Sequence, residues 1–186
     1  MSLKSRPKLK LGIRDVLTST VFGVSAGVLA SILERIDAAF TGGNATPLGY
    51  TNTYSWLLLS AYLYGPLGAL ITTEAQALIG LLTVANPLSW LWPSVNALFA
   101  FAAGFTSIAV SKLRPNTSIP IRLLIMSLVL ALLDIPAVYF VVVTVLGLPA
   151  AAYYLALPMY MFLQLVLATA VSYYLLRVLE KSGLKL

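Results

Sequence analysis

Long apolar segments are the feature that most constrains the fold of this chain. Five can be drawn, at about residues 16–36, 54–84, 88–111, 122–147 and 153–178. A transmembrane helix needs about 20 consecutive, mainly apolar residues, and each segment reaches that length. Only 10% of the residues are charged, whereas a soluble domain averages roughly 25%. The sequence therefore predicts an all-α membrane protein.

The basic residues determine how many times the chain crosses the membrane. They form three clusters: Lys4, Arg6, Lys8, Lys10 and Arg14; Lys112, Arg114 and Arg122; and Arg177, Lys181 and Lys185. Because loops on the cytoplasmic side are enriched in Lys and Arg, all three clusters should lie there. Five crossings would place the central cluster outside, whereas six place every cluster inside. We predict a compact bundle of six transmembrane helices with cytoplasmic N- and C-termini.

The sixth crossing comes from dividing the segment 54–84 at Gly65-Pro66. Proline removes a helix hydrogen bond and clashes with the preceding turn. As one straight helix, this segment would be about 46 Å long, well beyond a hydrocarbon core of ~30 Å. The result is a single membrane domain, residues 1–186, with helices at about 16–36, 52–64, 67–84, 88–111, 122–147 and 153–178. Residues 37–53 become a long external loop and a candidate lid.

Several classes of function lack the residues that they need. The chain contains no Cys and no His, which removes thiolate metal sites and the usual general base. There is no GxxxxGK[ST] motif for ATP hydrolysis. The basic residues border apolar segments instead of forming one soluble face, which argues against nucleic-acid binding. We therefore expect no enzyme activity, no metal and no cofactor.

Two carboxylates within apolar segments are the sharpest functional signal. They are Glu74 and Asp134. Placing a carboxylate at mid-membrane costs at least ~2.5 kcal/mol of free energy, so such side chains usually face the bundle interior or a cavity. In the predicted topology they lie at a depth similar to that of polar and aromatic side chains from other helices. The candidate ligand contacts are Glu74, Asn96, Trp92, Asp134, Tyr160, Gln164 and Trp56. The alternatives are a protonated acid bonded to a neighbouring helix, and, for the tryptophans, an interfacial aromatic belt.

Small residues recur four positions apart in the first apolar segment. They form the two series Gly23, Gly27, Ser31 and Ala26, Ala30. Small residues let two helix backbones approach closely in lipid. This face either packs inside the bundle or docks another protein, and the candidate docking residues are Ala26, Ala30, Gly23 and Gly27.

The whole pattern resembles the S components, the substrate-binding membrane subunits of energy-coupling factor (ECF) transporters. The shared features are a short basic N-terminus, six helices, a long first external loop and the A-x-x-x-A spacing of Ala26 and Ala30. Residues 65–70 (GPLGAL), followed by Glu74, look most like the YkoE-type branch, which is associated with thiamine and its hydroxymethylpyrimidine moiety. There a P-G-A run precedes the glutamate, whereas this chain has one residue inserted.

The resemblance implies a function and a set of partners. The chain would capture a water-soluble vitamin, with thiamine or a related pyrimidine favoured, at the external side of a prokaryotic plasma membrane. A membrane-embedded coupling subunit, docked at Ala26 and Ala30, and two ATPase subunits would drive uptake. Two other hypotheses remain: a self-contained channel or secondary transporter that uses Glu74 and Asp134 as a cation or proton relay, and a structural subunit of a membrane assembly.

Overall fold

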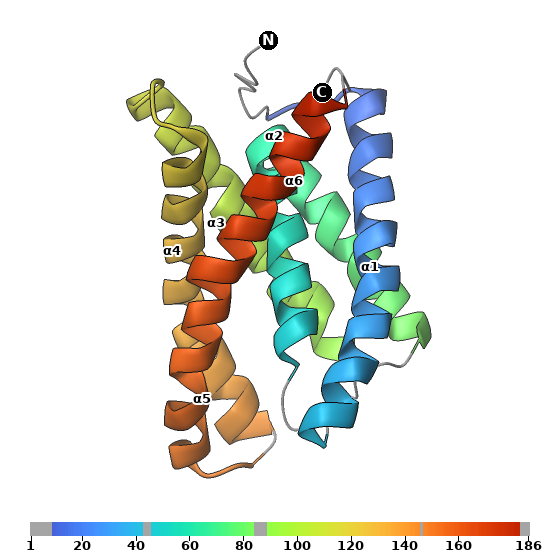
Figure 1. Ribbon diagram of the computed structural model, residues 1–186, viewed down its shortest axis with the longest axis vertical. Helices are drawn as coiled ribbons and strands as arrows, with labels where there is room; N and C mark the ends of the chain where they lie inside the picture. The colour runs from blue at the N-terminus through green and yellow to red at the C-terminus, as the bar shows by residue number, and fades with distance from the viewer. Residues whose placement is uncertain (1–8, 43–45, 84–88, 146, 183–186) are drawn as a thin grey trace.

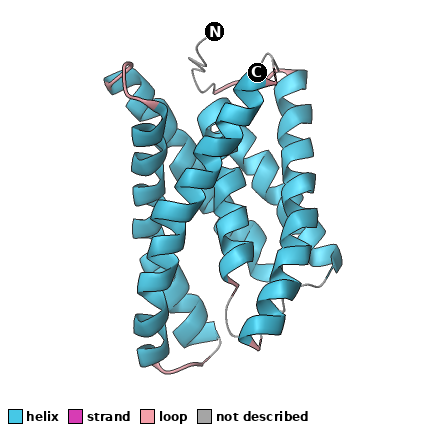
Figure 2. Cartoon of the chain, viewed as in Figure 1, coloured by secondary structure: helices cyan, strands magenta, loops and turns pink. Residues whose placement is uncertain are grey.

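The computed structural model describes residues 9–42, 46–83, 89–145 and 147–182. Within these ranges most residues are helical, short loops connect the helices, and there is no strand (Figure 2). Five helices are long and apolar enough to cross a membrane: Ile13–Thr41, Pro47–Thr83, Pro93–Leu113, Ile119–Val145 and Ala150–Lys181. The prediction of an all-helical, multi-pass membrane protein is confirmed at this level.

The elements follow one another along the chain as labelled in Figure 1. They are α1 (Ile13–Thr41), α2 (Pro47–Thr83), the short η1 (Ser89–Leu91), α3 (Trp92–Leu113), α4 (Ile119–Tyr139), η2 (Phe140–Val145), α5 (Ala150–Phe162), η3 (Leu163–Ala168) and α6 (Thr169–Lys181). Both η2 and η3 are π-helical, and they continue α4 and α5 without a break. A proline lies shortly before each of them, Pro136 in α4 and Pro158 in α5, where its missing N–H disturbs the regular ladder.

The second helix, α2, folds back on itself at the predicted Gly-Pro break. Gly65 has φ 73° and ψ −158°, a conformation that is open essentially only to glycine, and Pro66 follows it. The hydroxyl oxygens of Thr72 and Ser60 lie 2.8 Å apart, within hydrogen-bond distance, although a straight helix would hold residues twelve apart about 18 Å from each other. The two halves of α2 therefore lie antiparallel, as the teal and green segments of Figure 1 show.

The start of α1, the end of α6 and the α3–α4 connection lie at one end of the bundle, which we call the basic end (Figure 1). Arg14 lies in the first turn of α1, Lys112 lies in the last turn of α3, and Lys181 lies in the last turn of α6. The connections α1–α2 and η2–α5 lie at the opposite end, which we call the far end. All three basic clusters thus contribute residues to the same end of the bundle.

The connection between α1 and α2 is much shorter than the predicted loop 37–53. The first helix continues to Thr41, and α2 already begins at Pro47. Helix α1 ends where Gly42 takes a left-handed conformation, with φ 63° and ψ 24°, which is a common way for a helix to stop. A long lid over residues 37–53 is therefore wrong, because most of that segment is helical.

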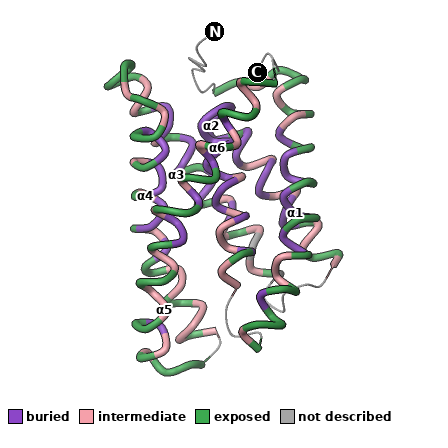
Figure 3. Tube along the Cα trace, in the orientation of Figure 1, coloured by how far each residue is buried: buried purple, intermediate pink, exposed green. Residues whose placement is uncertain are grey.

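Helix α2 lies at the centre of the bundle and supplies more of the buried residues than any other helix (Figure 3). Leu57, Leu58 and Leu59 are consecutive and buried, so the first half of α2 has protein on every side. A helix that is apolar all round is typical of such a central position. The other long helices each carry large apolar side chains on their outer faces, for example Val28 on α1 and Leu128 on α4. In a membrane these outer faces contact lipid.

Candidate functional site

A cluster of polar side chains surrounds Asp134 on α4. Asp134 is buried, with 4% of its surface exposed, and both of its carboxylate oxygens accept hydrogen bonds. The Tyr54 hydroxyl donates to Oδ1 over 2.6 Å, and the Tyr50 hydroxyl donates to Oδ2 over 2.7 Å. Because Tyr50 and Tyr54 are four residues apart on α2, they project from one face of that helix. The cluster therefore ties the first half of α2 to α4.

Gln164 of η3 is the fourth member of this Asp134 cluster. It is completely buried, its Oε1 lies 3.2 Å from the Tyr50 hydroxyl, and its Nε2 has no partner in the described residues. The single hydrogen of the Tyr50 hydroxyl is used in the shorter bond to Asp134.

The π-helical backbone at Gln164 also joins the cluster to α4. The carbonyl oxygen of Gln164 accepts a 2.8 Å hydrogen bond from the Ser127 hydroxyl. A π segment leaves such carbonyls available to side chains because its backbone hydrogen bonds skip an additional residue, and π segments are frequent at functional sites. Gln164 is thereby fixed through both its backbone and its side chain.

Aromatic rings pack around the Asp134 cluster. The ring centroid of Tyr50 lies 4.5 Å from that of Tyr54 and 4.8 Å from that of Tyr160 on α5. Tyr54 also packs against Phe99 of α3, with 5.9 Å between centroids. These separations lie within the range of favourable aromatic pairs. A single carboxylate is thus surrounded by rings that come from three helices.

The charge of Asp134 has no cationic partner within the described ranges; the ion pair there joins Arg177 and Glu180. Its neighbours are two hydroxyls and an amide, which stabilise a carboxylate without neutralising its charge. An unpaired buried charge is costly, and a cation near it is strongly favoured. The tyrosine faces would add cation–π attraction. The chemistry of the cluster therefore suits a small cation that carries apolar surface.

Glu74 lies at a second place, on the other half of α2, next in sequence to Thr73, whose backbone Asn96 of α3 contacts. Asn96 is buried, and its Nδ2 donates to the carbonyl oxygen of Thr73 over 3.2 Å. Glu74 is partly exposed, but its Oε1 is enclosed and has no partner in the described part of the chain. Gln76 bonds to Thr53, so Glu74 lies at about the level of the Asp134 cluster. No hydrogen bond among the described residues connects the two places.

Of the two tryptophans named as ligand contacts, Trp56 does not belong to the Asp134 cluster. Trp56 donates from Nε1 to Asn52 Oδ1 over 3.1 Å and packs against Phe22 of α1 at 5.4 Å. Asn52 in turn donates to the carbonyl oxygen of Ala26 over 3.0 Å. Trp56 is therefore part of the contact between α1 and α2. The side chain of Trp92 lies outside the described residues, although its backbone begins α3.

The small residues of α1 pack against the second half of α2. A Cβ on Gly23 would lie 2.4 Å from the carbonyl oxygen of Thr72, and one on Gly27 would lie 2.6 Å from Cβ of Ile79. Ala26 is completely buried, and Ala30 is 6% exposed. The structure therefore places these four residues in a contact inside the bundle. Docking of another protein at Ala26 and Ala30 stays a prediction, and it would require this contact to open.

Sequence reasoning brought Asp134, Tyr160 and Gln164 together by depth but missed the two tyrosines that connect them. Tyr50 fell within the predicted loop 37–53, and Tyr54 lay at the edge of the predicted helix. The available signal was their spacing of four, which gives one helical face once the helix is extended back to Pro47.

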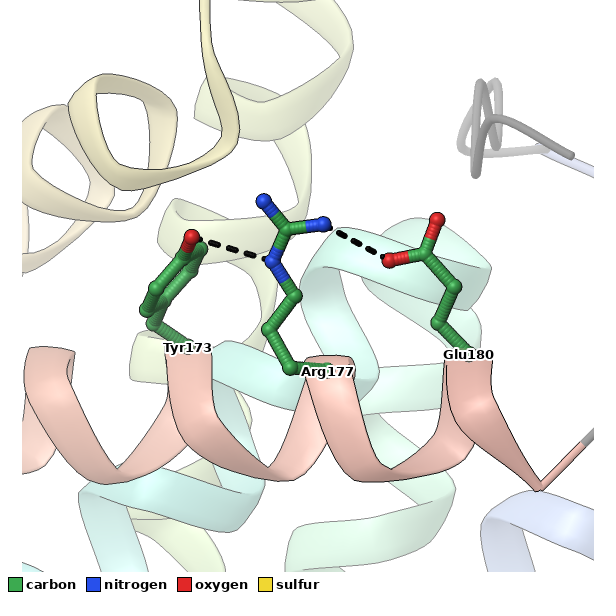
Figure 4. A network of polar contacts seen from close by, with 3 residues as sticks. All are labelled: Tyr173, Arg177 and Glu180. Carbon is green, nitrogen blue, oxygen red and sulfur yellow. Dashed lines mark hydrogen bonds and ion pairs between the residues drawn. The ribbon is translucent and has the colours of Figure 1, made fainter.

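Two polar groups at or toward the basic end have structural roles. Arg122 is buried, donates to the Ser107 hydroxyl over 2.9 Å and stacks over the Tyr62 ring at 4.5 Å. On α6, Arg177 donates to Tyr173 over 3.0 Å and pairs with Glu180 at 2.9 Å (Figure 4). Ion pairs on the surface contribute only about 0–1 kcal/mol, so neither group competes with Asp134 as a site.

In the described ranges there is no group of three or more acidic, His or Cys residues that could hold a metal ion. No family model matches the chain, and neither a curated protein nor a solved structure is similar to it. The resemblance to S components therefore rests on the sequence features alone, and the geometry around Asp134 has to be interpreted from its own chemistry.

Proposed function

We propose that this chain captures a small organic cation within the membrane, as the substrate-binding subunit of a vitamin importer. The observation that carries the proposal is the buried carboxylate of Asp134, held by the hydroxyls of Tyr50 and Tyr54 with no cationic partner in the described residues. A ligand with a positive charge and a flat apolar body would complete both the electrostatics and the aromatic packing. Thiamine, whose thiazolium ring is cationic, is the favoured ligand.

The proposed topology has six crossings, with the two halves of α2 counted separately. Their antiparallel arrangement makes the number of passes even, which agrees with the start of α1 and the end of α6 lying at one end. With the basic end in the cytoplasm of a prokaryotic cell, the far end faces outward. Tyr50 lies in the first turn of α2 at that end, so the Asp134 cluster would receive its ligand from the external side.

The proposed partners are a membrane-embedded coupling subunit and two ATPase subunits, as in ECF transporters. A capture subunit needs such partners because binding alone supplies no energy for uptake. Helix α1 remains the proposed docking element. Its small-residue face is occupied by α2 in the isolated chain, so docking would involve movement of one helix against the other.

Ligand analysis and titration test the capture function. Purified protein should retain a stoichiometric cationic molecule detectable by native mass spectrometry, and should bind thiamine in preference to an uncharged vitamin such as riboflavin. Asp134→Asn should weaken thiamine binding at least about tenfold, because removing one partner of a buried charge pair costs about 2–5 kcal/mol. Glu180→Gln, an acid at the basic end, is the matched control and should bind normally. Equal thiamine affinity in both variants would contradict the proposal.

A second function, cation- or proton-coupled transport by the chain alone, is favoured by Glu74. Its enclosed Oε1 without a partner is the kind of group that takes up a proton or cation during a transport cycle. Uptake into liposomes by the purified chain, driven by an ion gradient and abolished in Glu74→Gln, would establish this function in place of capture. Retention of ligand without any uptake would favour capture.

A further inference from the structure

Asp37 is a buried carboxylate in the last turns of α1, and its hydrogen bonds go to another helix. Only 2% of its surface is exposed. Its Oδ1 accepts from the backbone N–H of Leu48 over 3.1 Å, and its Oδ2 accepts from the N–H of Gly49 over 2.9 Å. Both amides belong to the first turn of α2, which begins at Pro47.

The first turn of a helix has backbone N–H groups without partners inside the helix, and it attracts negative charge. These groups are usually satisfied by the residue just before the helix. Here the acceptor comes from α1 instead. The start of α2 is therefore capped by a side chain whose position depends on where α1 lies.

Glu34 reinforces this contact one turn earlier on α1. A Cβ on Gly49 would lie 2.6 Å from Cγ of Glu34, so the two helices touch closely at the same point. Among the described residues of α1, Asp37 is the one buried residue beyond Ser31. The final turns of α1 are thus held to the bundle mainly through the start of α2.

The capped turn leads directly into the Asp134 cluster. Tyr50 follows Gly49, its backbone N–H donates to the Thr46 carbonyl over 2.8 Å, and its hydroxyl donates to Asp134. Tyr54 lies one turn further along α2 and binds the other oxygen of the same carboxylate. A shift of the first turn of α2 would therefore displace Tyr50 first.

We propose that Asp37 is a positioning residue for the ligand site, which fixes the first turn of α2 and with it the Tyr50 hydroxyl against Asp134. Asp37 acts through the backbone of Leu48 and Gly49 and need not touch the ligand. The expected effect of Asp37 on ligand affinity rests on the proposed capture function. Its expected effect on how rigidly the first turn of α2 is held does not.

Variants of Asp37 with a matched control on α2 test the proposal. Asp37→Ala removes both acceptors, and Asp37→Asn keeps one. Thr72→Val is the control, because the Thr72 hydroxyl also ties α2 to α1, through the Ser19 carbonyl at 3.0 Å, but far along the chain from Tyr50. Thiamine affinity, the midpoint of thermal unfolding and amide hydrogen exchange are measured for all three variants.

Thiamine affinity should fall in the order wild type, Asn, Ala. Loss of a cap costs about 0.5–2 kcal/mol, which corresponds to roughly a two- to thirtyfold loss in Asp37→Ala. Thr72→Val should lower the unfolding midpoint without weakening binding. If the wild type binds thiamine and both Asp37 variants bind it with the same affinity, or if Thr72→Val weakens binding equally, the positioning role is overturned.

Hydrogen exchange separates failure of this inference from failure of the capture function. In ligand-free protein, amides of residues 48–54 should exchange faster in Asp37→Asn than in Thr72→Val. Faster exchange supports the positioning role even if the wild type binds no thiamine. Equal exchange in the two variants contradicts it, whatever the wild type binds.

Discussion

Replacing Gly104 with alanine should destabilise the bundle, because Gly104 is where α3 touches the bend of α2. A Cβ at this position would lie 2.2 Å from Cα of Pro66 and 2.3 Å from its nitrogen. Favourable carbon–carbon contacts are about 3.5–4.0 Å, so α3 would have to move by more than about 1 Å. The atoms in the way are backbone, which cannot rotate aside.

The magnitude follows from two opposing effects. Overpacking of a buried site costs about 1–3 kcal/mol. Alanine is favoured over glycine inside a helix by about 0.5–1 kcal/mol. Since the clashing atoms are backbone and cannot rotate aside, the overpacking cost lies in the upper part of its range, at about 2–3 kcal/mol, and Gly104→Ala should lose about 1–2.5 kcal/mol of unfolding free energy.

A control on the same helix shows whether exchanging glycine and alanine has opposite effects on stability at the two positions. Ala109 of α3 is exposed, so Ala109→Gly reports the helix preference without the clash. Both variants should be less stable than wild type in detergent, measured by circular dichroism during thermal or denaturant unfolding. Alanine would thus be the better residue at position 109 and the worse one at position 104. A Gly104→Ala protein as stable as wild type would refute the close contact between α3 and the bend.

Three further substitutions test other contacts. Gly65→Ala should cost on the order of 1–3 kcal/mol in unfolding experiments, since φ 73° with ψ −158° strains any other residue, and an unchanged midpoint would contradict the bend. Tyr54→Phe should cost about 1–3 kcal/mol, because Asp134 loses a buried donor; a neutral result would mean that water replaces the hydroxyl. Gly27→Ala should lose about 1–3 kcal/mol through its clash with Ile79, and full stability would show that α1 and α2 can separate freely.

The features that could be predicted from the sequence are those with local causes. Long apolar segments become helices because of their own composition, and the chain bends at Gly65 because glycine and proline together disfavour a straight helix. The end of α1 and the start of α2 have a different cause. Residues after Asp37 look like a loop by composition, but a carboxylate from one helix caps the next one, and that contact exists only in the folded chain.

The sequence predicted the depth of the candidate site residues in the bundle, but not the direction in which each helix face points. Asp134, Tyr160 and Gln164 lie near one another because residues at similar heights in a bundle are neighbours. Trp56, also expected there, faces α1 instead. Spacing along a helix fixes which residues share a face, whereas the neighbour that the face meets depends on packing across the bundle.

The arrangement of the two intramembrane acids favours capture over relay. A proton relay needs an unbroken series of donors and acceptors between its carboxylates. Asp134 accepts hydrogen bonds from two hydroxyls of the first half of α2, whereas Glu74 lies on the second half, and no hydrogen bond joins the two acids within the described ranges. Capture requires only one enclosed charge and a surface that fits the ligand. Asp134 with its tyrosines supplies the enclosed carboxylate and aromatic faces on which the capture proposal rests.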